Sequence, residues 1–279
     1  MGILYLVATP IGNLEDITLR ALRVLKEVTL IAAEDTRTAR NLLTHFKIET
    51  RVTSYFEHNK LAKLDRILDA LERGDVAVVS EAGMPGLSDP GYELVRAALE
   101  RDIRVVPIPG ANALTAALVA SGLPTDQFIY LGFLPRQKSA RRKLLQSVAD
   151  EPRTLVAYEA PHRIRASLED VADILGDRSI CAARELTKVY EELFHGRVSE
   201  ARERFARTAP RGEFTLVIEG RTDDVRPEAE GAEPWDDAHI REAVRDLIAA
   251  GMPRTDAVKR VAREAGLPRR QVYQLAISR

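Results

Sequence analysis

The first 120 residues alternate short apolar runs with stretches whose apolar positions recur every three or four residues. A short apolar run bounded by turn residues predicts a buried strand, and the wider spacing predicts an amphipathic helix. The predicted strands are residues 2–8, 28–33, 52–56, 76–79 and 103–108, each followed by a helical pattern. Strands that alternate with helices in this way predict an α/β fold, a parallel sheet with right-handed crossovers.

A loop rich in glycine and proline, residues 80–91, leaves the fourth predicted strand and leads into a helix. In open α/β sheets, ligands bind at the carboxyl ends of the strands. Glycines let the backbone approach a ligand closely, and Ser88 and Asp89 can either cap the helix or meet polar groups of a ligand. The loop alone leaves open whether it is a ligand site or an ordinary connection, because such loops are common.

The rest of the chain predicts a second α/β region, a linker and a helical tail. The second region has predicted strands at 128–134, 154–158, 180–183 and 211–218, and residues 221–234 are polar and proline-containing. Residues 235–279 show three short helical patterns, with Thr255 as the expected cap of the second and a turn at 265–268, which is typical of a helix-turn-helix unit or of a packing cap. The predicted parts are therefore 1–120, 121–220, 221–234 and 235–279.

Composition limits the partners that the chain can have. The net charge of −1 excludes a globally basic surface for nucleic acid, so RNA or DNA contacts need local patches. One cysteine, Cys181, excludes a disulfide framework and a multi-cysteine zinc site, and its apolar surroundings predict a buried thiol. The histidines are scattered, so no metal site is predicted. No segment has the length of a membrane span, so we expect a cytoplasmic protein without membrane contact.

Seven short motifs follow one another along the chain. They are VATPIGNL at 7–14, AEDTR at 33–37, SEAGMPGLSDPG at 80–91, PIPG at 107–110, GFLP at 132–135, YEAPHR at 158–163 and ARELTK at 183–188. In these motifs, over nearly its whole length, the chain resembles the tetrapyrrole methylase fold and, within it, the ribosomal RNA small subunit methyltransferase I group. Members of that group transfer methyl from S-adenosyl-L-methionine to the ribose 2′-oxygen of a decoding-centre cytidine in 16S rRNA. The resemblance therefore implies this reaction, this cofactor and a homodimer.

The resemblance also implies where the cofactor binds. It places a bent S-adenosyl-L-methionine in a cleft between two α/β domains. Backbone hydrogen-bond donors suit this ligand, because methyl transfer depends more on a precise in-line approach of the acceptor oxygen to the methyl group than on a strong binding charge. The first loop lacks the Gly-x-Gly-x-Gly pattern of the other common methyltransferase fold. The implied cofactor residues are Pro10, Ser80, Glu81, Ala82, Gly83, Ser88, Asp89, Pro90, Gly110, Thr115, Tyr158, Ala183, Leu186, Gly212 and Thr215.

A ribose hydroxyl is a poor nucleophile at neutral pH, so the reaction needs alignment and either a base or a group that stabilises the oxyanion. Glu34 and Asp35 follow a predicted strand, Arg37 can hold a phosphate bidentately, and Glu185 and Lys188 are counterparts in the second region. The same charges can instead form ion pairs, such as Glu34–Arg37, that hold the loops. If they are substrate groups, Asp35→Ala abolishes methylation and leaves cofactor affinity near normal.

RNA contacts are expected from a basic cluster of the second region and from the tail. The cluster consists of Arg136, Lys138, Arg141, Arg142, Lys143, His162 and Arg163. Two other functions compete with RNA methylation. One is methylation of a tetrapyrrole carbon, which the AEDTR motif, the basic cluster and the tail disfavour. The other is a DNA-binding regulator led by the tail, which would not need two α/β regions.

Overall fold

The structure is a computed structural model that describes residues 1–56, 60–207, 210–222, 235–249, 251–265 and 269–277. The chain divides into two compact units, Met1–Thr222 and Asp223–Arg279. The first unit contains both α/β regions, and the second contains the tail. Most of the expected linker, residues 223–234, and the turn at 266–268 lie outside the described residues.

The first sheet is parallel throughout, as the alternating pattern predicts. Its strands are β1 (Leu4–Val7), β2 (Leu30–Ala33), β3 (Val52–Ser54), β4 (Val76–Val79) and β5 (Val105–Ile108), in the spatial order β3-β2-β4-β1-β5. Every neighbouring pair is parallel. The loops after all five strands therefore leave the same edge of the sheet, and the glycine-rich loop after β4 is one of them.

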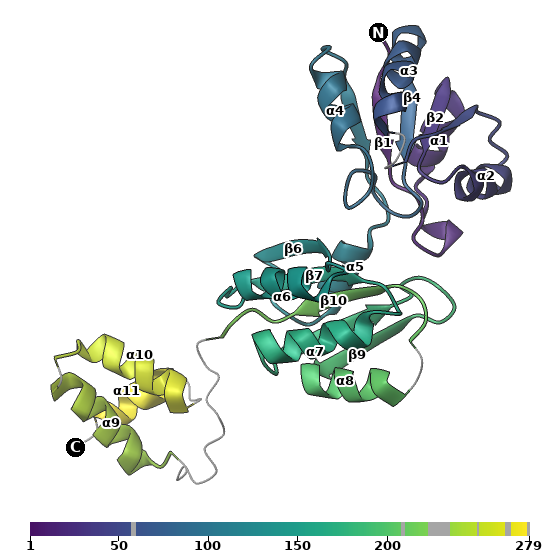
Figure 1. Cartoon of the computed structure of the whole chain (residues 1–279). Coiled ribbons are helices and arrows are strands. Elements are labelled where there is room, and N and C mark those ends of the chain that lie inside the picture. Colours follow the sequence, from purple (N-terminus) through teal and green to yellow (C-terminus); the bar gives the residue numbers. More distant parts are fainter. Residues whose placement is uncertain (57–59, 208–209, 223–234, 250, 266–268, 278–279) are drawn as a thin grey trace. The chain divides into compact units, whose positions relative to one another are not determined.

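Helices cover both faces of this sheet (Figure 1). α1 (Leu19–Glu27) and α2 (Thr36–His45) pack on one face, and α3 (Lys60–Arg73) and α4 (Tyr92–Leu99) pack on the other. Thr18 caps α1 by accepting a hydrogen bond from the Ala21 N–H at 3.0 Å. Ser88 and Asp89 do not cap α4, because Gly91 is its N-cap residue and no side chain bonds there. Both polar side chains therefore have other roles.

The second sheet is mixed. Its strands are β6 (Phe128–Phe133), β7 (Thr154–Glu159), β8 (Ser179–Arg184), β9 (Glu192–Arg197) and β10 (Phe214–Ile218), in the order β6-β7-β10-β8-β9. Only the β6–β7 pair is parallel. The sequence analysis did not predict β9 or the following helix α8 (Val198–Arg207), because β9 is a half-exposed edge strand and α8 is rich in charge.

Helices cover this sheet on both faces as well. α6 (Lys138–Ser147), α7 (Ile164–Leu175) and α8 share one core, and α5 (Ala113–Ala120) covers the opposite face with Leu114, Ala117 and Leu118. The sequence analysis placed α5 in the first domain, yet it packs on the second sheet. The core under α5 includes Cys181, which is buried as predicted, and burial raises the pKa of its thiol to about 11.

The tail has a small hydrophobic core of its own. α9 (Asp237–Ala249), α10 (Arg254–Ala265) and α11 (Arg269–Ile277) pack against one another around Ile240, Val244, Val258, Val261 and Val272. The expectation that Thr255 caps the second helix is wrong, because α10 already begins at Arg254. The side chains of four basic residues of the tail lie outside the described set: Lys259, Arg263, Arg269 and Arg270.

Candidate functional site

A cavity of about 540 Å³ lies where the loops at the carboxyl edge of the first sheet meet the second sheet. The loops after β1, β2, β4 and β5 form one wall, and residues of β6, β7, β8 and β10 form the other. Of the cofactor residues implied by the motifs, the cavity is lined by Pro10, Glu81, Ala82, Gly83, Ser88, Asp89, Tyr158, Ala183, Leu186 and Thr215. The structure therefore brings most of that set together.

Hydrogen bonds between two loops fix the wall on the first sheet. The Thr9 N–H donates to the Gly83 carbonyl at 2.9 Å, and the Gly83 N–H donates back to the Thr9 carbonyl at 3.1 Å. Gly83 has φ +83°, a conformation that favours glycine. The buried Ser80 hydroxyl donates to the same Gly83 carbonyl at 3.2 Å. Ser80 thus supports the loop from behind and does not line the cavity.

Aromatic side chains form much of the opposite wall. The Tyr158 hydroxyl accepts a hydrogen bond from the Leu114 N–H at 3.1 Å, at the start of α5. Its ring meets the Tyr130 ring edge-on, with centroids 5.3 Å apart, and the Tyr130 hydroxyl lies 2.6 Å from the Ser88 hydroxyl. Burial raises the pKa of Tyr158, so its hydroxyl keeps its proton at neutral pH. The Ser88–Tyr130 bond ties the glycine-rich loop to the second sheet.

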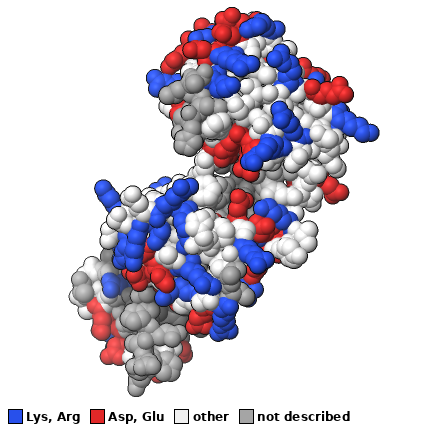
Figure 2. Space-filling model, turned by 45° about the vertical axis from the view of Figure 1, so that its right-hand side comes forward, with Lys and Arg blue, Asp and Glu red and all other residues white. Residues whose placement is uncertain are grey.

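Carboxylates dominate the charge of the cavity. They belong to Glu34, Glu81, Asp89, Glu185 and Glu213, and Lys188 is the single cationic residue lining the cavity in the part of the chain that the structure describes. Burial, followed by repulsion from the Glu34 carboxylate, raises the pKa of Asp89 to about 7. Figure 2 shows acidic side chains on both sides of the waist between the two sheets. Such an excess of negative charge suits a cationic ligand.

Lys188 is held by two of these carboxylates. Its ammonium lies 2.8 Å from Glu185 Oε1 and 3.6 Å from Glu213 Oε2. Glu185 Oε1 also accepts a hydrogen bond from the Glu213 N–H at 3.0 Å. Glu185 has φ +51°, in the left-handed region, and its carboxylate packs against Gly212, where a Cβ atom would lie 2.2 Å from Glu185 Cγ. Gly212 therefore makes room for Glu185 and does not line the cavity.

Three further implied cofactor residues lie behind the lining: Pro90, Gly110 and Thr115. A Cβ atom on Gly110 would lie 2.8 Å from Ala8 Cβ, so Gly110 lets the loop after β5 approach β1. The Thr115 hydroxyl donates to the Asn112 carbonyl at 3.2 Å within the first turn of α5. Both residues shape the wall without facing the cavity.

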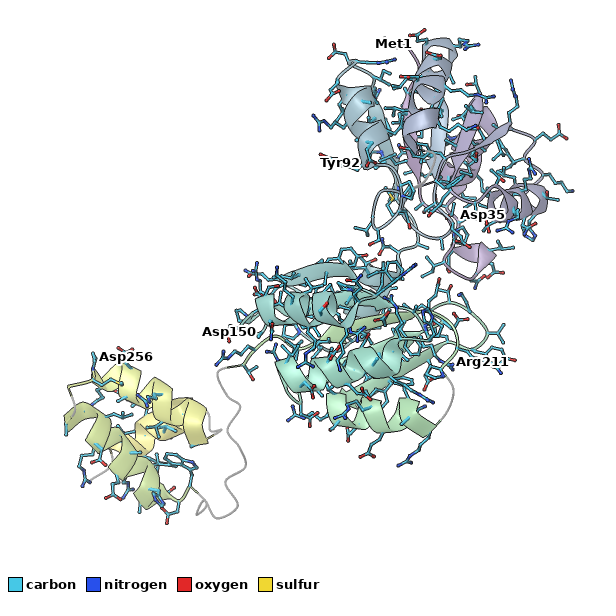
Figure 3. The ribbon with its side chains drawn as sticks, viewed as in Figure 1. Met1, Asp35, Tyr92, Asp150, Arg211 and Asp256 are labelled. Carbon is cyan, nitrogen blue, oxygen red and sulfur yellow. The ribbon has the colours of Figure 1, made fainter. Side chains whose placement is uncertain are left out.

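The acidic motif after β2 places its two carboxylates differently. Glu34 lines the cavity, and its Oε2 accepts a hydrogen bond from the Glu81 N–H at 3.2 Å. Asp35 and Arg37 do not line it. Asp35 is the N-cap residue of α2, and its carboxylate accepts from the Arg37 N–H and pairs with the Arg37 guanidinium, both at 2.7 Å. This hydrogen bonding lowers the pKa of Asp35 to about 2. Asp35 lies at the end of the sheet opposite Met1 (Figure 3).

The predicted basic cluster is only partly available to a ligand. Arg141 is buried with its guanidinium 2.7 Å from the Asp170 carboxylate, so it cannot contact RNA. Arg142 pairs with Asp170 at 2.7 Å and Asp173 at 2.9 Å.

Arg163 pairs with buried Glu159 at 2.6 Å and donates to the Leu134 carbonyl. These three arginines hold the second domain together. The exposed members of the cluster are Arg136, Lys138, Lys143 and His162.

Lys188 lines the cavity as the sequence analysis expected, whereas ten other lining residues were not singled out there: Ile11, Gly12, Thr38, Met84, Leu87, Asn112, Ala113, Phe133, Glu213 and Phe214. Most of them lie in or beside the motifs that carry the resemblance, and this nearness is the sequence signal that could have identified them as site residues. Among the described residues, no group of His, Cys, Asp and Glu side chains is arranged to hold a metal ion. None of the described helices has the length and apolar character that crossing a membrane requires.

Comparisons with known proteins agree with this architecture. The profile of the Tetrapyrrole (Corrin/Porphyrin) Methylases matches residues 3–202, and the profile of the RsmI C-terminal HTH domain matches residues 236–279. A solved structure of uroporphyrin-III C-methyltransferase from Thermus thermophilus, complexed with S-adenosyl homocysteine, shares 21% identity and a TM-score of 0.54, covering 78% of this chain and 97% of that one. At this identity the likeness shows the fold alone.

Curated relatives are much closer in sequence. The ribosomal RNA small subunit methyltransferase I of Synechocystis is 50% identical over 99% of this chain and 98% of its own length. The protein of the same name from Halalkalibacterium halodurans is 49% identical over 98% of this chain and 94% of its own. This chain therefore belongs to the tetrapyrrole methylase family and, within it, to the ribosomal RNA small subunit methyltransferase I family.

Proposed function

We propose that the protein transfers the methyl group of S-adenosyl-L-methionine to the ribose 2′-oxygen of a decoding-centre cytidine in 16S rRNA of the small ribosomal subunit. The observation that carries this proposal is the full-length similarity to proteins named ribosomal RNA small subunit methyltransferase I. The acid-lined cavity supplies a site for the reaction, and the helix-turn-helix tail supplies a second RNA-binding element. We further propose that the enzyme is cytoplasmic and acts as a homodimer.

The methyl donor is S-adenosyl-L-methionine, and the cavity suits it. Its volume of about 540 Å³ is in the range of small-molecule sites, roughly 300–1,000 Å³. Ala183, Leu186 and Thr215 offer a narrow, mostly apolar wall, whereas the glycine-rich loop offers backbone groups. The carboxylates match the positive charges of the cofactor. When bound, the cofactor supplies an electrophilic methyl group on a sulfonium.

The chain's own residues must then align and activate the ribose hydroxyl. In this proposal Glu34 accepts the proton of the hydroxyl, because it is the carboxylate of the AEDTR motif that lines the cavity. Lys188, held in place by Glu185, stabilises the oxygen as negative charge develops on it.

Cofactor binding should depend on pH through Asp89, whose pKa of about 7 reflects burial and its acidic neighbours. A sulfonium favours the charged carboxylate, so binding lowers this pKa and releases a proton. We expect affinity for S-adenosyl-L-methionine to rise about tenfold from about pH 6 to about pH 8. S-adenosylhomocysteine, which has no sulfonium charge, should respond less. Titration calorimetry in buffers of different ionisation enthalpy measures both the affinity and the proton release.

The matched variants for this test are Asp89→Asn and Glu213→Gln. Asp89→Asn removes the titrating group, so the affinity for S-adenosyl-L-methionine should no longer depend on pH. Glu213→Gln removes only a neighbouring charge, so the affinity should still rise with pH. A pH dependence of affinity that persists in Asp89→Asn would assign the titration to another group.

The tail should contribute RNA affinity and leave cofactor binding unchanged. The ribosomal RNA small subunit methyltransferase I of Thermotoga maritima aligns over its whole length with only 79% of this chain. The remaining part of this chain therefore has no counterpart in that relative. We expect removal of residues 235–279 to weaken binding to small subunits by roughly 1 kcal/mol, a factor of about five, and by less at high salt, where phosphate contacts of the tail are screened. Filter binding across a salt series, with calorimetry of the cofactor as control, measures this. Equal binding by both forms would limit the tail to packing.

The deciding experiment identifies the methylated product. The protein is incubated with labelled S-adenosyl-L-methionine and small subunits from cells that lack it, and the modified nucleoside is mapped. Label on a cytidine 2′-oxygen supports the proposal. Label on a base or another nucleotide would change the target. No label on the RNA, with the cofactor still bound, would overturn the proposal and direct the search to tetrapyrroles and other small substrates.

A further inference from the structure

A bulge in β6 changes the side of the sheet to which Phe133 points. Tyr130 pairs with Val156 of β7, and the next pairing joins Phe133 to Tyr158, so β6 advances by three residues while β7 advances by two. Gly132, inside this bulge, has φ +68°. Bulges are rare in parallel pairs and often re-aim a side chain beside a functional site.

Regular alternation would have placed Phe133 in the core. Ile129 and Leu131, at every second position of β6, pack against the core shared with α6 and α7. Phe133 continues that series in the sequence. In the structure its ring instead meets Tyr158 edge-on, with centroids 5.3 Å apart, and lines the cavity. The bulge therefore moves a large apolar ring from a buried position to the ligand side.

Phe133 remains half open to solvent in this position. Its relative exposure is 51%, and it is more exposed than the two tyrosines with which it shares this wall. An exposed phenylalanine ring does not contribute the free energy of stabilisation that burial would give. Its exposure at this position therefore points to a role in binding a ligand. An aromatic face at the rim of a cavity suits a planar ligand, and proteins that select single RNA nucleotides commonly stack an unpaired base on such a ring.

We propose that Phe133 is the stacking platform for the base of the nucleotide that the enzyme methylates. This inference rests on the proposed RNA methylation and adds the residue that orients the target. Exposed Arg136 and Lys138 come three and five residues after Phe133, where they can meet the flanking phosphates. The stack fixes the base, and the base in turn positions its ribose hydroxyl toward Glu34 and Lys188.

The test compares Phe133→Ala, Phe133→Leu and Phe133→Trp with Phe128→Ala. Phe128 is a matched control because it lies on the same strand, is 39% exposed and does not line the cavity. For each variant, kcat and KM are measured with small subunits, the Kd of S-adenosyl-L-methionine by calorimetry, and Tm by thermal unfolding. We expect Phe133→Ala to lower kcat/KM roughly tenfold or more, mainly through KM, with the Kd unchanged.

The expected order separates stacking from simple apolar contact. Phe133→Trp should keep most of the activity because it retains an aromatic face, Phe133→Leu should resemble Phe133→Ala, and Phe128→Ala should resemble the parent. Full activity of Phe133→Leu would overturn the inference. A loss of cofactor affinity in Phe133→Ala as large as its loss of kcat/KM would also overturn it, because the ring would then contact the cofactor. If the parent protein labels no RNA, the proposed function itself fails. If Phe133→Ala labels RNA as fast as the parent, only this inference fails.

Discussion

Glu34→Gln is expected to slow methyl transfer about a hundredfold, the lower end of what a positioned general base contributes. Glu34 lines the cavity, where its carboxylate can meet a substrate hydroxyl, and its Oε2 accepts a hydrogen bond from the Glu81 N–H at 3.2 Å. Glutamine keeps the shape of the side chain but accepts a proton poorly. Single-turnover methylation of small subunits with saturating cofactor measures the effect on the chemical step.

The neighbouring Asp35→Asn is the matched control, because it makes the same chemical change one residue away. Asp35 caps α2 and pairs with Arg37, and asparagine caps a helix as well as aspartate does, so Asp35→Asn should lose only the exposed ion pair and leave both stability and the methylation rate near normal. The sequence alone predicted that Asp35 is the essential residue of this motif. A large loss of rate in Asp35→Asn with normal Glu34→Gln would restore that prediction and assign Glu34 to the loop.

Asp170→Ala is expected to destabilise the protein by about 3–5 kcal/mol, the effect of leaving a buried charge without its partner. Asp170 is 1% exposed, and its carboxylate accepts from Arg141 Nε at 2.8 Å and from Arg142 at 2.7 Å. Burial alone would raise the pKa of Asp170, but the two guanidinium groups hold it below its ordinary value. Because the pKa of Asp170 is lower in the folded protein than in the unfolded chain, its ion pairs stabilise the fold fully at a pH above its unfolded pKa. This stabilisation is lost as the pH falls toward the pKa of Asp170 in the folded protein.

Urea unfolding at neutral and acidic pH measures this prediction. Asp173→Ala is the control, because Asp173 also pairs with Arg142 but is exposed, and its loss should cost at most about 1 kcal/mol. The difference between the two variants should shrink in acid. Equal stability of Asp170→Ala and Asp173→Ala would show that water satisfies the buried Arg141 guanidinium when Asp170 is absent. Loss of RNA binding by a stably folded Asp170→Ala variant would return Arg141 to the RNA surface.

The sequence by itself determined the strands of the first sheet and the loops that form half of the cavity. Continuous apolar runs such as residues 76–79 indicate strands buried on both faces, and parallel strands deliver their following loops to one edge. The glycines of the loop at residues 80–91 mark it as a connection with backbone conformations that favour glycine, such as the φ of +83° at Gly83. These features depend on residues near one another in the chain, so they can be inferred before any tertiary contact is known.

Tertiary structure alone decided which charged residues are available and which side chains face the cavity. Arg141 and Lys143 belong to one basic run, yet one is buried against Asp170, 29 residues away in sequence, and the other is exposed. Glu34 and Asp35 are adjacent, yet only one lines the cavity. Phe133 changes sides through a bulge that is defined by its pairing with β7. In each case the outcome depends on a partner distant in sequence, because burial and ion pairing are properties of the packed chain.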